Sequence, residues 1–192
     1  MEEDPVGNQI RREMRNLAKG FIVLIITPAE HYMTTTIAFM DYAINEEYLK
    51  GVYVTANRPY INLMNMFKER DISPDNLLFV DCISAMAGEK TGRRGNCIYV
   101  TSPLELERIT DYVDTLLDEL GDETKRFIYL DSLSTFLLYN SISSVGKLSH
   151  FLINKLRLKN MSGVFLTLEL EAPTELIQRL TVLCDKVVRV RT

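Results

Sequence analysis

Short runs of apolar residues alternate with amphipathic segments from residue 20 to the end of the chain. The runs lie at residues 21–26, 52–55, 77–80, 97–100, 127–130, 164–168 and 187–190. Most of them are continuous and rich in Val, Ile and Phe, which is typical of parallel strands that are covered on both faces. The pattern therefore predicts seven buried strands.

The segments between these runs carry apolar residues at helical spacing. The three clearest stripes are Ile37, Met40 and Ile44; Leu106, Ile109, Val113, Leu116 and Leu120; and Val145, Leu148, Leu152 and Leu156. Ser102-Pro103-Leu104-Glu105 has the pattern of a capping box that starts a helix, and Gly121 suits its far end. Strands that alternate with helices predict an α/β fold of three layers, in which a mostly parallel, twisted sheet lies between helices.

The length of the chain fits a single domain over residues 1–192. Residues 1–19 are expected to form a leading amphipathic helix, whose basic face carries Arg11, Arg12, Arg15 and Lys19. Residues 85–96 contain three glycines and three basic residues and predict a flexible loop. Its Lys90, Arg93 and Arg94 are candidates for binding an anion or an acidic partner.

Composition narrows the class of protein. With 46% hydrophobic and 25% charged residues, the chain has the composition of an ordinary globular protein. A net charge of −4 does not favour binding to nucleic acid or to an anionic membrane, and no apolar run approaches the length of a membrane span. Three widely separated cysteines without a C-x-x-C pair predict reduced thiols in a cytoplasmic protein, not a zinc site or a disulfide framework.

Polar residues follow the predicted strands where each of them ends. They are Thr27, Asn57 with Arg58, Asp81, Thr101 with Ser102, Asp131 with Ser132, and Glu169 with Glu171. Ligands of open α/β sheets bind beyond the carboxyl ends of the strands. We therefore expect any functional site along this rim.

Residues 21–48 have the strand–loop–helix outline of a phosphate-binding P-loop, whose pattern is G-x-x-x-x-G-K-[ST]. If Thr34 and Thr35 are set on the final hydroxyl and its neighbour, the lysine position holds Met33, the glycine before it holds Tyr32 and the first glycine holds Thr27. A P-loop needs glycines because backbone N–H groups must turn inward toward the phosphates, with φ values that side chains disfavour. Met33 also cannot neutralise phosphate charge. The motif is therefore predicted to be degenerate.

The strand at 127–130, which leads into Asp131 and the segment SLSTFLLYN, looks like a Walker B segment. Together with the first strand–loop–helix and the segment GVYVTANRPYINLM, it makes residues 20–190 resemble the KaiC-like branch of the RecA superfamily, which is common in archaea. The resemblance implies a RecA-type core, ATP with magnesium, and often a ring-shaped assembly. It also implies that Thr34 is the metal-side hydroxyl and Asp131 the metal-side carboxylate. The family's catalytic glutamate after the second strand has no counterpart in Thr55-Ala56-Asn57-Arg58.

A second capping box, Thr27-Pro28-Ala29-Glu30, lies where the phosphate loop would be. It predicts that the following helix begins early. Glu30 would then sit at the positive end of the helix, in the place of a phosphate. We hypothesise that this carboxylate fills the anion site.

These observations predict a catalytically inactive KaiC/RecA-like domain that acts as a binding or regulatory module, for example in signalling. We expect its partner to be another protein, such as an intact ATPase, or a second copy of the chain, and we expect no cofactor. The alternative is an atypical nucleotide-binding protein or ATPase that uses Thr34, Thr35 and Asp131 with ATP and magnesium. In a plainer interpretation, Asp131 only hydrogen-bonds the turn that follows its strand. A Rossmann-type cofactor site is disfavoured because no G-x-G-x-x-G follows the first strand.

Overall fold

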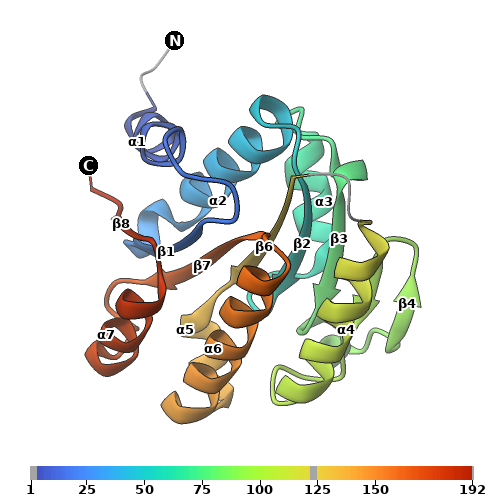
Figure 1. Ribbon diagram of the computed structural model, residues 1–192. Coiled ribbons are helices and arrows are strands. Elements are labelled where there is room, and N and C mark those ends of the chain that lie inside the picture. Colours follow the sequence, from blue (N-terminus) through green and yellow to red (C-terminus); the bar gives the residue numbers. More distant parts are fainter. Residues whose placement is uncertain (1–3, 122–124, 192) are drawn as a thin grey trace.

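A twisted sheet runs through the centre of the molecule (Figure 1). The computed structural model describes residues 4–121 and 125–191, and within them eight strands pair in the order β4-β5-β3-β2-β6-β7-β1-β8. Neighbouring strands are parallel except for β4 and β5, which are antiparallel. The strands are β1 (Ile22–Thr27), β2 (Lys50–Thr55), β3 (Leu77–Asp81), β4 (Gly92–Arg94), β5 (Cys97–Tyr99), β6 (Arg126–Asp131), β7 (Ser162–Leu168) and β8 (Lys186–Arg189).

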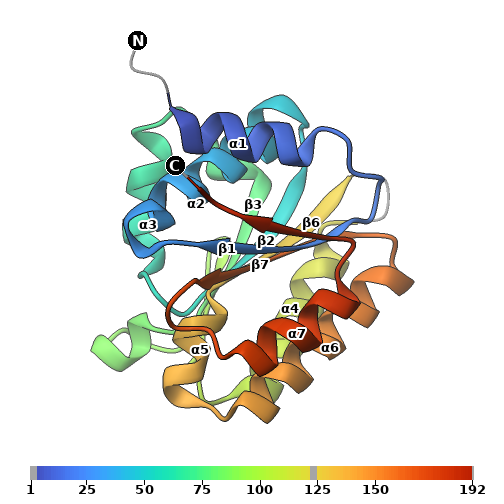
Figure 2. The same ribbon diagram turned by 90° about the vertical axis from the view of Figure 1, so that its left-hand side faces the viewer.

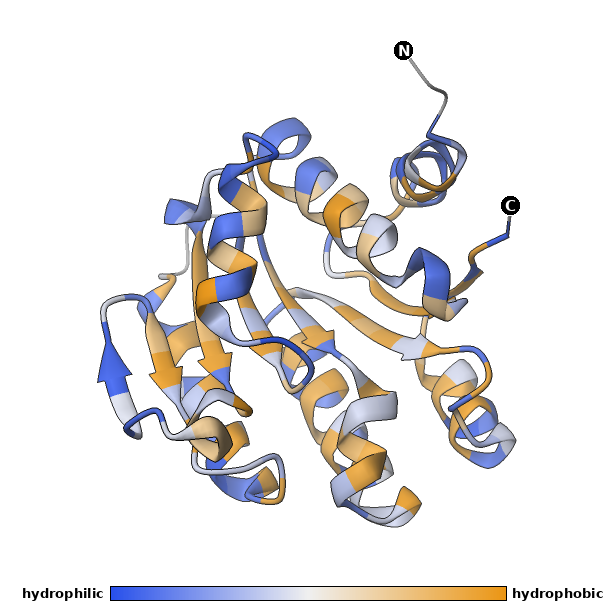
Figure 3. Ribbon diagram, turned by 180° about the vertical axis from the view of Figure 1, so that it is seen from behind, coloured by the Kyte–Doolittle hydropathy of each residue, from blue (hydrophilic) through white to orange (hydrophobic). Residues whose placement is uncertain are grey.

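The seven predicted strands are all present, within two residues of their predicted bounds. β4 was not predicted. It lies inside the segment 85–96 that we expected to be an irregular loop, and it is a short edge strand of sequence Gly-Arg-Arg. Such a strand has no hydrophobic periodicity to identify it. Figure 3 shows the contrast between the hydrophilic β4 and the hydrophobic central strands.

Helices cover both faces of the sheet (Figure 2), which confirms the predicted three-layer α/β architecture. The helices on one face are α1 (Pro5–Met14), α2 (Tyr32–Asp41) and α3 (Tyr60–Lys68), and those on the other are α4 (Leu106–Glu119), α5 (Leu133–Tyr139), α6 (Ile142–Leu158) and α7 (Thr174–Leu183). The short helical turns are η1 (Ala29–His31), η2 (Tyr42–Glu46, a π-helical turn), η3 (Pro74–Asn76) and η4 (Ser84–Ala87). Within the described residues, no helix combines the length and the apolar composition that crossing a membrane requires.

The basic face of α1 docks on the end of α2. The Arg11 guanidinium forms ion pairs with Asp41 and with Glu46, the latter at 2.7 Å. Arg15 lies 3.7 Å from the other oxygen of Glu46. Part of the predicted basic face is therefore used inside the domain, and Lys19 lies beyond the helix. Residues 1–3 of the predicted leading helix lie outside the described residues.

The predicted start of α4 is wrong, whereas its predicted end is confirmed. The Ser102 hydroxyl accepts a hydrogen bond from the Leu104 N–H at 3.2 Å, so it closes a tight turn before the helix and does not cap it. The helix begins only at Leu106. Gly121 follows the last turn with a φ of +71°, the left-handed conformation that glycine adopts at least cost.

Aromatic rings pack across the sheet on the face covered by α2 and α3. The ring of Tyr129 on β6 lies 5.1 Å from that of Tyr53 on β2 and 5.2 Å from that of Phe39 on α2. Tyr53 in turn lies 5.6 Å from Phe79 on β3. All four rings are fully buried, and the hydroxyl of Tyr53 reaches Asp131 at the carboxyl end of β6.

Candidate functional site

Two aspartates occupy equivalent positions at the carboxyl edge of the sheet. β2 lies between β3 and β6, and Thr55 pairs in register with Asp81 on one side and with Asp131 on the other. Both carboxylates are fully buried. A buried charge must be hydrogen-bonded or its ionisation is disfavoured, so the donors around each aspartate indicate its role.

Asp81 is held by backbone donors. Its oxygens accept hydrogen bonds from the N–H groups of Tyr60 at 2.7 Å, Ile83 at 2.9 Å and Ser84 at 2.8 Å, and from the Ser84 hydroxyl at 2.5 Å. These contacts join the turn after β3 to the start of α3. Asp81 is therefore a structural residue that fixes the rim.

Among the described residues, the side-chain carboxylate of Asp131 accepts hydrogen bonds only from tyrosine hydroxyls. Tyr32, the first residue of α2, and Tyr53, on β2, each donate to Oδ2 at 2.5 Å. The other oxygen, Oδ1, is buried without a hydrogen-bond partner among the described residues. Burial raises the pKa of Asp131 to about 6, although the two tyrosine hydroxyls and the Arg58 charge act in the opposite direction.

The two tyrosines are fixed as donors. Burial, followed by the negative charge of Asp131, raises the pKa of both Tyr32 and Tyr53 well above the usual range for tyrosine. Both hydroxyls therefore stay protonated near neutral pH. The guanidinium carbon of Arg58 lies 6.0 Å from the centre of the Tyr32 ring, which places a positive charge over the outer side of this cluster.

The segment between β1 and α2 is a closed turn. Pro28 is followed by η1, and the regular helix begins at Tyr32. The Thr27 hydroxyl lies 3.1 Å from that of Thr35 and 3.3 Å from the Pro28 carbonyl oxygen. It does not cap the helix as we predicted, and Glu30 is exposed. The hypothesis that Glu30 fills an anion site is therefore wrong, because the side chain that turns inward is that of Tyr32.

The predicted site residues differ in their surroundings. Thr35 is fully buried against Thr27, whereas Thr34 is half-buried. Among the described residues, neither threonine forms a hydrogen bond with Asp131. The Oδ2 atom of Asp131 accepts hydrogen bonds from Tyr32 and Tyr53 instead. The prediction missed the role of Tyr53. Its sequence signal was weak but real, because a tyrosine within a buried strand needs a partner for its hydroxyl.

The family is shown by the sequence of the chain. Residues 27–190 match the model of a family of unknown function, DUF7504. This chain belongs to that family. No curated protein matches the sequence.

Solved structures share the fold of this DUF7504 member. KaiC-like protein PH0186 from the hyperthermophilic archaeon Pyrococcus horikoshii OT3 superposes with a TM-score of 0.60 at 12% identity, over 90% of this chain and 72% of that one. Uncharacterised protein PH0321 from Pyrococcus horikoshii, in complex with an unknown peptide, superposes with a TM-score of 0.68 at 11% identity, over 96% and 82%. At such low identity the likeness establishes the fold alone, and it confirms the predicted KaiC-like RecA architecture.

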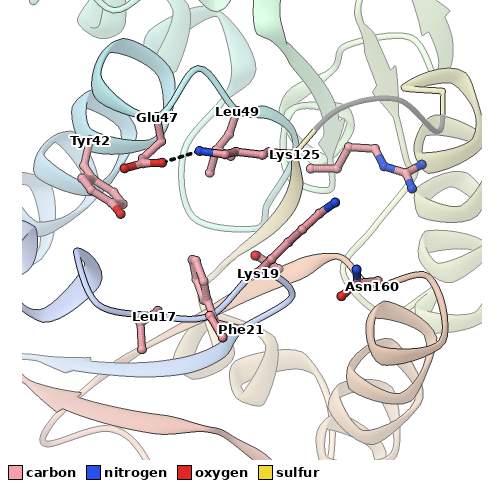
Figure 4. A pocket seen from close by; sticks show the side chains of 11 residues that line it. Leu17, Lys19, Phe21, Tyr42, Glu47, Leu49, Lys125 and Asn160 are labelled. Atoms are coloured by element: carbon pink, nitrogen blue, oxygen red, sulfur yellow. Dashed lines mark hydrogen bonds and ion pairs between the residues drawn. The ribbon is translucent and has the colours of Figure 1, made fainter.

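A pocket lies at the opposite, amino end of the sheet (Figure 4). It has a volume of about 130 Å³. Its apolar lining includes Leu17, Phe21, Tyr42 and Leu49, and its polar lining includes Lys19, Glu47, Lys125, Arg126, Asn160 and Ser162. Glu47 and Lys125 form an ion pair at 2.6 Å across its rim. Its lining combines no nucleophile with a neighbouring base.

Other candidate groups are inert in the structure. Cys82, Cys97 and Cys184 are free thiols, and burial raises the pKa of Cys82 well above its usual range and those of Cys97 and Cys184 to about 12. Within residues 4–121 and 125–191, no group of three His, Cys, Asp or Glu side chains is placed to hold a metal ion. His150 is exposed and pairs with Asn154 on its own helix.

Proposed function

We propose that this DUF7504 member is a binding or regulatory module on a KaiC-like RecA fold that does not hydrolyse ATP. The observation that carries this proposal is the hydrogen bond from Tyr32 to Asp131. Tyr32 stands where the sequence alignment to the P-loop pattern places a glycine. Its side chain points inward to the acid that would serve the metal, where a P-loop would present backbone N–H groups to phosphates.

The groups around Asp131 argue against magnesium at this position. Oδ2 already accepts two hydrogen bonds, and the whole carboxylate, including the unpartnered Oδ1, is fully buried, so a hydrated magnesium ion could reach it only if the side chains around it moved apart. The turn after β2 is also closed, because the Thr55 hydroxyl donates to the Arg58 carbonyl oxygen at 2.7 Å. No carboxylate stands in this turn to polarise an attacking water. The position of the P-loop lysine holds Met33, which carries no charge to offset a phosphate.

A protein partner is supported by the exposed apolar side chains that follow the carboxyl ends of the strands. Met86 is 51% exposed, Leu104 60%, Leu138 76% and Leu170 98%. They lie on separate segments after β3, β5, β6 and β7, and we take them as candidate contacts with another protein or with a second copy. PH0321, which shares this fold, was determined in complex with an unknown peptide, and we take this as support for a peptide or protein partner of this chain. Free thiols fit a cytoplasmic setting, and a net charge of −4 does not favour nucleic acid as the partner.

Calorimetric titration of nucleotide-stripped protein with ATP and ADP, with and without magnesium, tests the proposal. We expect no binding heat at millimolar nucleotide and no phosphate release. Micromolar binding that is lost in both Thr34→Ala and Asp131→Ala would overturn the proposal. That result would establish the alternative of an atypical nucleotide-binding protein that uses Thr34, Thr35 and Asp131. Lys147→Ala, on the exposed side of α6, serves as the matched control that should behave like the unchanged protein.

A further inference from the structure

Gln9 on α1 bonds to the backbone of the last strand that the structure describes. Its Nε2 donates to the Arg189 carbonyl oxygen at 2.8 Å, and the Arg191 N–H donates to its Oε1 at 3.0 Å. A residue on a neighbouring parallel strand would bond to the same two groups through its own N–H and C=O. The Gln9 amide therefore imitates one residue of an additional strand.

β8 is an edge strand. It pairs with β1 on its inner side, where the Val190 N–H donates to the Ile26 carbonyl oxygen at 2.9 Å, and within the described residues no strand pairs with its outer side. Backbone groups of alternate residues point outward, and among the described residues the Gln9 amide bonds to those of Arg189 and Arg191. Uncovered edge strands are templates for strand addition. Figure 2 shows β8 at this edge, next to α1.

A groove of about 360 Å³ runs along this edge between α1 and β8. Its lining is Gln9, Glu13, Val187, Val188, Arg189 and Arg191. Glu13 is paired with Lys186 at 2.8 Å, whereas the exposed guanidinium groups of Arg189 and Arg191 form no ion pair among the described residues. A groove with two uncompensated positive charges in a protein of net charge −4 is complementary to an acidic segment.

We propose that the outer edge of β8 binds an extended acidic peptide segment of a protein partner, which adds as a further strand and displaces the Gln9 amide. The segment would gain backbone hydrogen bonds from β8 and ion pairs from Arg189 and Arg191. Gln9 covers the edge when the partner is absent. This inference deepens the proposed function, since it names the chemistry of the partner.

Fluorescence anisotropy with the labelled peptide acetyl-EVEVEVE-amide tests the proposal. We expect the unchanged protein to bind this acidic peptide and not to bind the basic peptide KVKVKVK. The peptide EVEPEVE should bind more weakly, because proline removes a backbone donor. Gln9→Ala removes two competing hydrogen bonds and should tighten binding roughly tenfold. The double variant Arg189→Glu with Arg191→Glu should weaken binding by at least roughly tenfold, because it reverses the charge of the groove.

Controls separate this inference from other causes. Asn8→Ala, an exposed neighbour on the same helix, should leave the affinity unchanged, and Gln9→Met keeps the side-chain length if Gln9→Ala does not fold. Hydrogen exchange should show new protection of the Arg189 amide when the peptide binds. Equal binding of the basic peptide, an unchanged affinity in both Gln9 variants, or binding without that protection would overturn strand addition.

Nucleotide titration of the same preparation keeps the two proposals distinguishable. If the protein binds neither the peptide nor nucleotide, only the β8 inference is overturned. If the protein turns over ATP, only the proposed function is overturned.

Discussion

The phenolic hydroxyl of Tyr32 lies 2.5 Å from Oδ2 of Asp131, and the two residues are separated by 99 positions in the sequence. This contact joins the turn after β1 directly to the end of β6. In a P-loop enzyme the same two places are bridged by phosphate and metal. Here the Tyr32 side chain makes this connection, so the turn after β1 and the end of β6 are joined without a ligand.

Replacing Tyr32 with phenylalanine should destabilise the protein. The substitution keeps the ring but leaves the buried Asp131 with one donor, and losing a hydrogen bond to a buried charged group costs about 1–3 kcal/mol. Urea unfolding at pH 7 measures the effect. Tyr48→Phe, at a position that is 78% exposed, is the control and should change the free energy of unfolding by less than about 0.5 kcal/mol. Equal stabilities of the two variants would contradict the assigned hydrogen bond.

The two buried aspartates should respond in opposite ways to amide substitution. Asp81→Asn places an NH₂ group against backbone N–H donors, so it should lower the free energy of unfolding by about 2 kcal/mol or more. Asp131→Asn keeps an oxygen for both tyrosines and removes a poorly solvated charge. Its stability at pH 7 should match or exceed that of the unchanged protein. Thermal and urea unfolding measure the stability of both variants. If Asp131→Asn were less stable than Asp81→Asn, the roles assigned to the two aspartates would be contradicted.

Asp131 should make stability fall as the pH rises from about 4 to 6. Its pKa in the folded protein is about 6, above its usual 3.8, so in this window the folded state holds a proton that the unfolded state has released. The shift corresponds to about 3 kcal/mol of stability that is present in full only below the unfolded-state pKa of 3.8 and is lost by pH 7. The difference in unfolding free energy between the unchanged protein and Asp131→Asn isolates this group. A difference that stays constant from pH 4 to 8 would contradict the raised pKa.

The strands could be predicted from the sequence because burial on both faces of a parallel sheet leaves a continuous apolar run. The site could be predicted only in part. Asp131 was identified by its position after a strand, but its partners Tyr32 and Tyr53 lie 99 and 78 residues away, beyond any local pattern. The inward turn of Tyr32 depends on a buried carboxylate that only the folded sheet supplies. Likewise, the hydroxyls of Thr27 and Ser102 form hydrogen bonds within tight turns, to the Pro28 carbonyl oxygen and the Leu104 N–H. Neither hydroxyl caps the helix that the sequence pattern predicted.

Gly51 should not tolerate a larger residue. A Cβ at this position on β2 would fall on the ring of Phe127, its neighbour in register on β6. Gly51→Val should therefore displace the ring and cost about 1–3 kcal/mol through overpacking. Gly146→Ala is the matched control, because a Cβ there would meet only Leu176 at an ordinary contact distance of 3.7 Å. Urea unfolding curves compare the two variants. Similar losses of unfolding free energy would show that the space beside Phe127 does not restrict the size of residue 51.

Arg93 should control the local opening of β4 more than the stability of the whole domain. Its guanidinium bonds both oxygens of Glu119 on α4, at 2.6 and 2.7 Å, and thereby ties the edge strand to a helix. Both side chains are 42% exposed, so Arg93→Ala should lower the unfolding free energy by less than about 1 kcal/mol. Amide exchange over residues 92–99 should nevertheless accelerate, because the removed contact joins β4 to α4. Arg108→Ala removes the exposed pair with Glu105 at the start of the same helix and should leave that exchange unchanged. If both variants leave it unchanged, the backbone pairing of β4 with β5 holds this edge without the ion pair.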